Sequence, residues 1–312
     1  MFAANCAARQ DVSSVGANLV FALPICVRPA YLCSPSILCS PSNPMTVQPI
    51  SFLQIAIATL LVVFCGVLSV VFRLRLEKQL LIASARTIVQ LLLVGYLLKY
   101  VFALQSLWLI FGLALLMVGI ASRAATGRTA YRYKCMTLHA FLSLAVSGFL
   151  TTFIVTAVII NVHPWYRPQY LVPLLGMILG NSLTSVSLSL DGLFSDMVLR
   201  RPEIEMALSH GATAWEAAQE PLQNAVRRGM VPTINSMLVV GIVSLPGMMT
   251  GQILAGSDPL QAVKYQIVVM FMLAAATALG CISIALLAYR QLFNARHQLE
   301  ESRLTTRKKA AF

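Results

Sequence analysis

Long uninterrupted runs of apolar residues dominate the chain from residue 50 onward. Residues 50–72, "ISFLQIAIATLLVVFCGVLSVVF", carry no charged side chain. About 20 apolar residues suffice to cross the hydrocarbon core of a bilayer as a helix. The pattern recurs and predicts seven spans, at about 50–72, 85–103, 105–122, 138–161, 170–190, 231–254 and 266–289. The sequence therefore predicts an all-α fold, a polytopic membrane helical bundle.

Charge is scarce and unevenly placed along the chain. Only 11% of the residues are charged, too few to cover a soluble domain of this size. The net charge is +12, and 18 of the 23 Lys and Arg residues fall in residues 73–86, 123–137, 191–230 and the tail after 289. The positive-inside rule then predicts an outside N-terminus and a cytoplasmic C-terminus in a multi-pass protein of the cytoplasmic (inner) membrane. Topology explains the basic excess, so no nucleic acid partner is expected.

The first 44 residues differ from the rest of the chain. The stretch "VRPAYLCSPSILCSPSNP" is rich in Pro, Ser and Cys and follows neither a helical nor a strand period. Two interpretations stay open: translation begins at Met45, or residues 1–44 are a flexible or cleaved leader. The expected organisation is a disordered leader or mis-assigned start at 1–44, a transmembrane domain at 45–290 with cytoplasmic helices at 200–228, and a basic cytoplasmic tail at 291–312.

One polar segment interrupts the apolar pattern. Residues 203–222, "EIEMALSHGATAWEAAQEPL", hold four of the eleven acidic residues. Pro202 suits the first turn of a helix, and Glu203 and Glu205 follow where the helix dipole favours anions. Gly211 fits the position just after the end of that helix. The segment therefore predicts a short helix closed by a glycine turn.

A second helix is predicted directly after this turn. Thr213 as N-cap and Glu216 three residues later match a capping box, and Pro221 and a basic stretch follow. The apolar positions of the two helices are mostly small: Met206, Ala207, Leu208, Ala214, Trp215, Ala218 and Leu222. Such a segment has no core of its own and needs a partner surface. A helix pair lying on the bilayer is the alternative, although inner-leaflet binders are usually basic and this pair begins acidic.

The stretch "EMALSHGA" followed by a helix resembles the "EAA…G" coupling loop of ABC permeases, which docks in a groove of the ATPase subunit. Ala207 stands at the first Ala of that pattern and Gly211 at its glycine. From about Met45 to Leu299, the chain resembles the FetB-type family of ABC permeases, described as iron exporters and related to plant aluminium-tolerance permeases. The matching stretches are "RTIVQLLLVGYLLKYVF" (86–102), "GMILGNSLTSVSLSL" (176–190), "LSHGAT" (208–213), "GIVSLPGMMTGQILAGSDPLQAVKYQIVVMFML" (241–273) and "NARHQL" (294–299).

The resemblance implies an ABC transporter permease that exports iron, another metal ion or a metal chelate. ATP and Mg²⁺ would bind a separate ABC-type ATPase subunit, and two copies of this chain would form a homodimer around one pathway. The coupling residues that it implies are Glu203, Glu205, Ala207, Gly211, Ala212 and Thr213. The chain has no P-loop and no hydrolase motif, so neither enzymatic activity nor a cofactor is expected in it.

Polar residues in the predicted fifth span are candidates for a transport pathway. These candidates are Asn181, Ser182 and Ser185. Helical spacing places Asn181, Thr184 or Ser185, and Leu188 on one face. Gly176 and Gly180 have the spacing that lets membrane helices approach closely. Interhelical packing with hydroxyls bonded to their own helix is the alternative to a polar pathway.

The stretch "SLPGMMTGQ", residues 244–252, interrupts the predicted sixth span. Pro246 removes a backbone hydrogen bond and Gly247 adds conformational freedom, which favours a hinge or gate beside a cavity. Met248 and Met249 bring thioethers, which suit soft ions better than iron. They are weak metal candidates, because methionine in a membrane core usually serves packing.

Other functions remain as alternatives. The four histidines show no metal-binding spacing, so a histidine metal site within the chain is not expected. Glu77, Asp191, Asp196 and Asp258 fall in predicted connections, and the absence of acidic residues from the spans counts against a gradient-driven secondary transporter or channel. An ABC permease for a nucleotide sugar or another small solute and a non-transporting scaffold are the further alternatives.

Overall fold

The computed structural model describes residues 51–73, 77–104, 106–294, 298, 300 and 305–306, which belong to one compact unit. The predictions for residues 1–44 and for most of the tail lie outside the described residues. The helices are α1 (Phe52–Val71), α2 (Glu77–Leu104), α3 (Leu107–Gly127), α4 (Met136–Phe153), the π-helix η1 (Ile154–Ile159), α5 (Pro168–Leu199), α6 (Arg201–Ser209), α7 (Ala214–Val239), α8 (Gly247–Leu254) and α9 (Pro259–Leu292).

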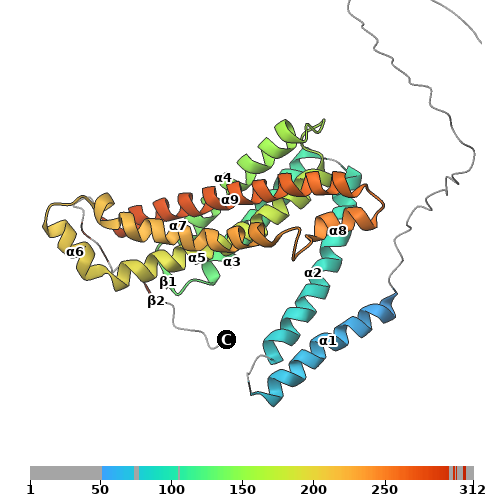
Figure 1. Cartoon of the computed structure of the whole chain (residues 1–312), viewed down its shortest axis with the longest axis horizontal. Helices are drawn as coiled ribbons and strands as arrows, with labels where there is room; N and C mark the ends of the chain where they lie inside the picture. The colour runs from blue at the N-terminus through green and yellow to red at the C-terminus, as the bar shows by residue number, and fades with distance from the viewer. Residues whose placement is uncertain are drawn as a thin grey trace, which may run out of the picture. The chain divides into compact units, whose positions relative to one another are not determined.

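The bundle is built around α5, α7 and α9, which pack against one another along their lengths (Figure 1). Helices α5 and α9 run in the same direction and α7 runs against them, while α3 and α4 pack on the other side of α5 and α9. Helix α1 packs against α2. The short strands β1 (Tyr131–Arg132) and β2 (Thr305–Thr306) pair antiparallel, which brings part of the tail to the loop after α3. The predicted all-α membrane bundle is confirmed.

Six helices in the described part of the chain are long and apolar enough to cross a membrane: α1, α2, α3, α4 with η1, α5 and α9. The predicted sixth span at 231–254 is not a single helix. Helix α7 ends at Val239, and α8 begins only at Gly247, after Gly241 with φ of +87° and Pro246 in extended conformation. Pro246 cannot donate a helical hydrogen bond, so the predicted interruption at this proline is confirmed.

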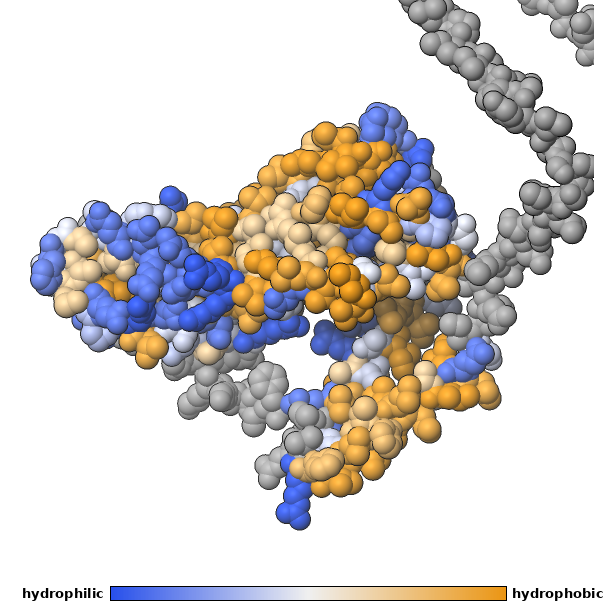
Figure 2. Space-filling model, in the orientation of Figure 1, coloured by the Kyte–Doolittle hydropathy of each residue, from blue (hydrophilic) through white to orange (hydrophobic). Residues whose placement is uncertain are grey.

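Helices α5 and α9 are longer than their predicted spans. With 32 residues, α5 is about 48 Å long, whereas a bilayer core is about 30 Å thick. The last turns of α5 therefore extend beyond the apolar layer and continue the bundle toward α6. The space-filling view shows the result: hydrophilic residues gather over α6 and the start of α7, and apolar residues cover most of the remaining bundle (Figure 2).

The tightest helix contact lies where α7 crosses α5 and α9. A Cβ atom added at Gly229 would lie 2.6 Å from Cys281 Sγ and 2.8 Å from the Ser185 carbonyl oxygen. Within the described part of the chain, no helix approaches Gly176 and Gly180 closely: an added Cβ meets only the Met117 side chain at Gly176 and nothing within 4 Å at Gly180. The small residue that this packing requires is Gly229 of α7, which lies against both α5 and α9.

Candidate functional site

The polar segment forms the predicted helix, glycine turn and second helix. Helix α6 begins at Arg201 with Pro202 in its first turn, and Gly211 follows it with φ of +92°. The Gly211 N–H donates to the Leu208 carbonyl at 3.1 Å, and the Ala212 N–H donates to the Ala207 carbonyl at 3.1 Å. These two bonds make a Schellman motif, which glycine favours because its left-handed residue carries no Cβ.

The predicted capping box at the start of α7 is also present. The Thr213 hydroxyl accepts from the Glu216 N–H at 3.3 Å, and Glu216 Oε2 accepts from the Thr213 N–H at 2.8 Å. The helices predicted at 200–228 extend further, since α7 continues through Pro221 and Pro232 to Val239. Packing of α7 along α5 and α9 outweighs the backbone bonds that the two prolines remove.

Acidification is expected to loosen this cap. The Thr213 backbone and side-chain donors lower the pKa of Glu216 below that of an ordinary glutamate. A lowered pKa contributes stability above the unfolded-state pKa and loses it as pH falls through the folded-state pKa. Amide hydrogen exchange of residues 213–217, corrected for its intrinsic pH dependence, should lose protection in that acidic range. In Glu216→Gln, which keeps an acceptor without a charge, protection should not follow this titration; an identical profile would contradict the assignment.

The two helices pack partly on their own chain. Ile204 and Ala218 are buried in the main core, and Trp215 meets Tyr289 of α9 edge-on with ring centroids 5.8 Å apart. The segment forms no core of its own, and part of the surface it packs on is the bundle of the same chain, where its small residues join the main core. Met206 nevertheless stays 59% exposed and Trp215 49% exposed. The hairpin is thus fixed to the bundle and still exposes part of its apolar surface at Met206 and Trp215.

Ion pairs fix the direction of α6. Arg200 pairs with Glu203 at 3.0 Å and reaches Glu220 of α7 at 2.5 Å, and Arg201 pairs with Glu205 at 2.7 Å. The hydrogen bond that the Arg200 guanidinium donates to the Glu220 carboxylate raises the pKa of Arg200. Exposed pairs of this kind each contribute little free energy. Their geometry matters more, because Arg200 lies at the α5–α6 junction and contacts Glu220 of α7. It therefore links the start of α6 to the second helix of the hairpin.

A buried ion pair joins α5 to α7 behind the hairpin. Asp196 Oδ1 lies 2.9 Å from Arg228 Nη2, and the Asp196 side chain is only 8% exposed. Asp191, five residues earlier, accepts from the Ala130 N–H at 3.0 Å. The expectation that Asp191, Asp196 and Glu77 lie in connections is wrong, because α5 runs on to Leu199 and α2 begins at Glu77. Asp258 does lie in a connection, where it caps α9.

The pathway candidates on α5 divide into two groups. Ser182 and Ser185 are buried in the bundle, and the Ser182 hydroxyl has no hydrogen-bond partner. Asn181 is exposed and its amide donates to the Met177 carbonyl of the preceding turn at 3.0 Å. The shared face predicted for Asn181 and Leu188 is present, since both point away from the bundle. Of the three candidates on α5, Asn181 is therefore the one placed to line a pathway along the outer face of this helix.

Sequence reasoning missed a second exposed amide, on α7. Asn235 is exposed in the half of α7 that follows Gly229. Because α7 runs against α5 from the Gly229–Ser185 contact, Asn235 lies about 9 Å further toward the start of α5, near the level of Asn181. An exposed amide inside a predicted span was the signal in the sequence. Polar groups at this depth rarely face lipid, which points to a covering protein or to water.

A cavity of about 420 Å³ lies beside the helix break. Met177 of α5, Met248 and Gln252 of α8 and Tyr265 of α9 line it, and no residue of its lining is charged. The side-chain amide oxygen of Gln252, Oε1, is shielded from solvent and has no hydrogen-bond partner. Of the residues predicted at the break, Met248 reaches this cavity; Pro246, Gly247 and Met249 do not line it.

The described residues contain no group of three or more His, Cys, Asp and Glu side chains that could hold a metal ion. Thioethers, amides and phenols line the cavity instead. Carboxylate oxygens are the usual ligands of hard metal ions, and thioethers select soft ones. The lining therefore does not match a bare trivalent ion.

The long apolar helices and the polar hairpin at one end define a multi-pass membrane protein. The chain belongs to the uncharacterised protein family UPF0014, whose profile matches residues 52–293.

Curated relatives cover most of this chain. It is 43% identical over 72% of its length to the UPF0014 membrane protein slr1647 of Synechocystis, covering 87% of that protein. It is 36% identical over 80% of its length to the "Probable iron export permease protein FetB" of Escherichia coli, covering 95% of it. Protein ALUMINUM SENSITIVE 3 of Arabidopsis thaliana is 32% identical over 78% of this chain, with 88% of that protein covered. No solved structure matches the chain.

Proposed function

We propose that this chain is the permease subunit of an ABC transporter that exports iron or another metal ion, or its chelate, across the cytoplasmic membrane. The observation that carries the proposal is the α6–α7 hairpin. It is rigidly closed by the Gly211 turn and the Thr213 cap, and it presents Met206 and Trp215 at the polar end of the bundle. The name of the Escherichia coli relative supports metal export as the activity.

A separate ABC-type ATPase that binds ATP and Mg²⁺ would supply the energy. The hairpin, with Glu203, Glu205, Ala207, Gly211, Ala212 and Thr213, would dock on this partner. Helix α7 begins in the hairpin and continues without interruption to Val239, so it can carry a displacement about 39 Å along the bundle. The far end of α7 leads into the break before α8. Helix α8 contributes Met248 and Gln252 to the cavity. Closure of the ATPase would thereby change access to the cavity.

Two copies of the chain would enclose the pathway. Asn181 of α5 and Asn235 of α7 are exposed at a similar level of the bundle, where lipid is an unfavourable neighbour for an amide. A second copy on this face would cover both amides and place them beside a shared polar path. A homodimer would also provide the two hairpins that a pair of ATPase subunits requires.

The uncharged cavity favours a complexed substrate over a bare ion. Its volume falls within the range of small-molecule sites, and its amide and phenol groups suit neutral hydrogen-bonding partners. A metal chelate satisfies both properties. The same lining favours a second candidate function, an ABC permease for a nucleotide sugar or another small solute. A gradient-driven carrier is less well supported, because the one buried carboxylate of the described residues, Asp196, is paired with Arg228.

The docking role is tested by two substitutions in the hairpin. Gly211→Asp places a side chain at φ of +92°, which costs about 1–2 kcal/mol and reshapes the turn. Met206→Glu leaves the turn intact and puts a charge on the exposed apolar surface. Both variants are expected to enter the membrane normally and to lose co-purification with the ABC-type ATPase and the ATP hydrolysis of the complex, measured with and without Fe(II) or Fe(III).

Ser257→Glu is the matched control, since it adds the same charge in the exposed turn before α9, at the opposite end of the bundle. This variant should retain both association and ATP hydrolysis. Normal association in Gly211→Asp and Met206→Glu would reject the hairpin as the docking element and would favour a gradient-driven carrier or a scaffold.

A further inference from the structure

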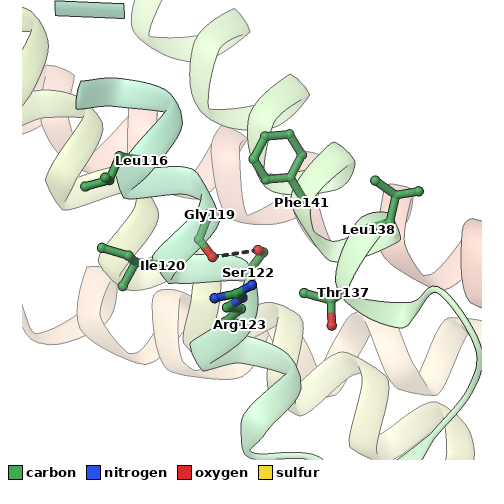
Figure 3. A pocket seen from close by; sticks show the side chains of 8 residues that line it. All are labelled: Leu116, Gly119, Ile120, Ser122, Arg123, Thr137, Leu138 and Phe141. Atoms are coloured by element: carbon green, nitrogen blue, oxygen red, sulfur yellow. Dashed lines mark hydrogen bonds between the residues drawn. The ribbon is translucent and has the colours of Figure 1, made fainter. Parts of the chain in front are cut away.

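A groove between α3 and α4 has an arginine at one end and apolar walls along the rest. Its volume is about 490 Å³, and its lining includes Leu116, Ile120, Leu138 and Phe141. Figure 3 shows Arg123 of α3 and Thr137 of α4 together at one end, with Leu116 and Phe141 toward the other. The groove is therefore amphipathic along its length.

The groove lies on the outer surface of the bundle at the depth of the membrane. Leu116, Ile120 and Leu138 are all more than half exposed, although they belong to helices that are long and apolar enough to cross a bilayer. Arg123 lies four residues before the end of α3, so its guanidinium can reach the boundary between the apolar layer and water. Among the described residues, no acidic side chain pairs with Arg123.

We infer that this groove binds an anionic phospholipid, with its phosphate on Arg123 and Thr137 and an acyl chain along Leu116, Ile120 and Phe141. A guanidinium recognises phosphate oxygens with paired hydrogen bonds, and the threonine hydroxyl adds a donor from the second helix. The Ser122 hydroxyl does not compete for the headgroup, because it donates to the Gly119 carbonyl of its own helix at 2.9 Å (Figure 3).

Arginines also line two neighbouring grooves, which favours lipid as the occupant. Arg290 lines the groove between α4 and α9, and Arg227 lines the groove between α7 and α9. Basic side chains between membrane helices on the cytoplasmic side are a recognised site for anionic headgroups. The α3–α4 groove is the largest of the three and therefore offers the most room for an acyl chain.

Native mass spectrometry of the full-length chain tests the inference. The purified protein is titrated with phosphatidylglycerol or phosphatidylcholine, and the lipid adducts and the oligomeric mass are recorded together. Wild type should retain phosphatidylglycerol in preference to phosphatidylcholine. Arg123→Gln should weaken phosphatidylglycerol binding about fivefold, as expected for one basic residue near a membrane surface, and should weaken phosphatidylcholine binding less, because choline already neutralises its phosphate.

Arg132→Gln is the matched control, because it removes the same charge from the exposed strand β1, outside the groove. Ile120→Trp fills the apolar part of the groove while keeping Arg123, and should weaken the binding of both lipids. It serves as the test if Arg123→Gln does not fold.

An equal effect of Arg132→Gln would indicate diffuse surface charge and overturn the site. Binding of inorganic phosphate as tight as that of the lipid would indicate a free-anion site. A change in oligomeric mass with unchanged lipid adducts would indicate a second copy as the occupant.

Discussion

Gly229→Ala is expected to destabilise the folded bundle by about 1–3 kcal/mol, the usual cost of forcing an extra carbon into a packed core. The added Cβ would lie 2.6 Å from Cys281 Sγ and 2.8 Å from the Ser185 carbonyl oxygen. The thiol can rotate, but the carbonyl belongs to the backbone of α5 and cannot move without bending that helix. Thermal unfolding of the detergent-purified protein, followed by size-exclusion chromatography after heating, measures the loss.

Two companion variants show whether the effect comes from this contact. Gly180→Ala makes the same chemical change inside α5, where nothing lies within 4 Å of the added carbon, so it should leave stability unchanged or raise it by up to about 1 kcal/mol. Cys281→Ala combined with Gly229→Ala should recover only part of the loss, because the carbonyl contact remains. Equal stability of Gly229→Ala and Gly180→Ala would refute the close crossing of α5 and α7.

Arg228→Met is expected to destabilise the bundle by about 2–3 kcal/mol. Removing one member of a buried ion pair typically costs about 3–5 kcal/mol, because the other charge stays buried without compensation. The lower figure applies here because Arg228 is itself 51% exposed, while Asp196 is the enclosed partner. Methionine keeps the apolar stem that packs over Gly192, so the change removes the charge and the long hydrogen bond to the Gly192 carbonyl but little packing. Chemical or thermal unfolding in detergent provides the measurement.

The order of effects within this pair is the sharper test. Asp196→Asn should cost about 1 kcal/mol, because Arg228 is half exposed and can turn to water. The double variant should be more stable than Arg228→Met alone, since the uncompensated carboxylate has then been removed. Simple additivity of the two single changes would show that Asp196 and Arg228 do not interact.

The local structure of the hairpin could be predicted from short sequence patterns. Pro202 at the start of α6, Gly211 after its end and the Thr213–Glu216 cap each depend on hydrogen bonds within a few residues, and the structure contains all of them. The end of α7 could not be predicted in the same way. Pro221 is a local signal for stopping a helix, but its burial against the bundle is a property of the tertiary structure.

The sequence by itself determined the class of protein and the approximate positions of six long apolar helices, because apolar runs of sufficient length have one stable environment. The Pro-Gly pair at 246–247 also indicated a helix break in this region, and the structure has it between Val239 and Gly247. Only the tertiary structure decided which small residue permits the closest helix contact, Gly229 rather than Gly176 or Gly180. It alone paired Asp196 with Arg228 and brought Met177 and Met248 to one cavity. These residues lie on different helices, and their distances depend on how the helices pack rather than on their spacing along the chain.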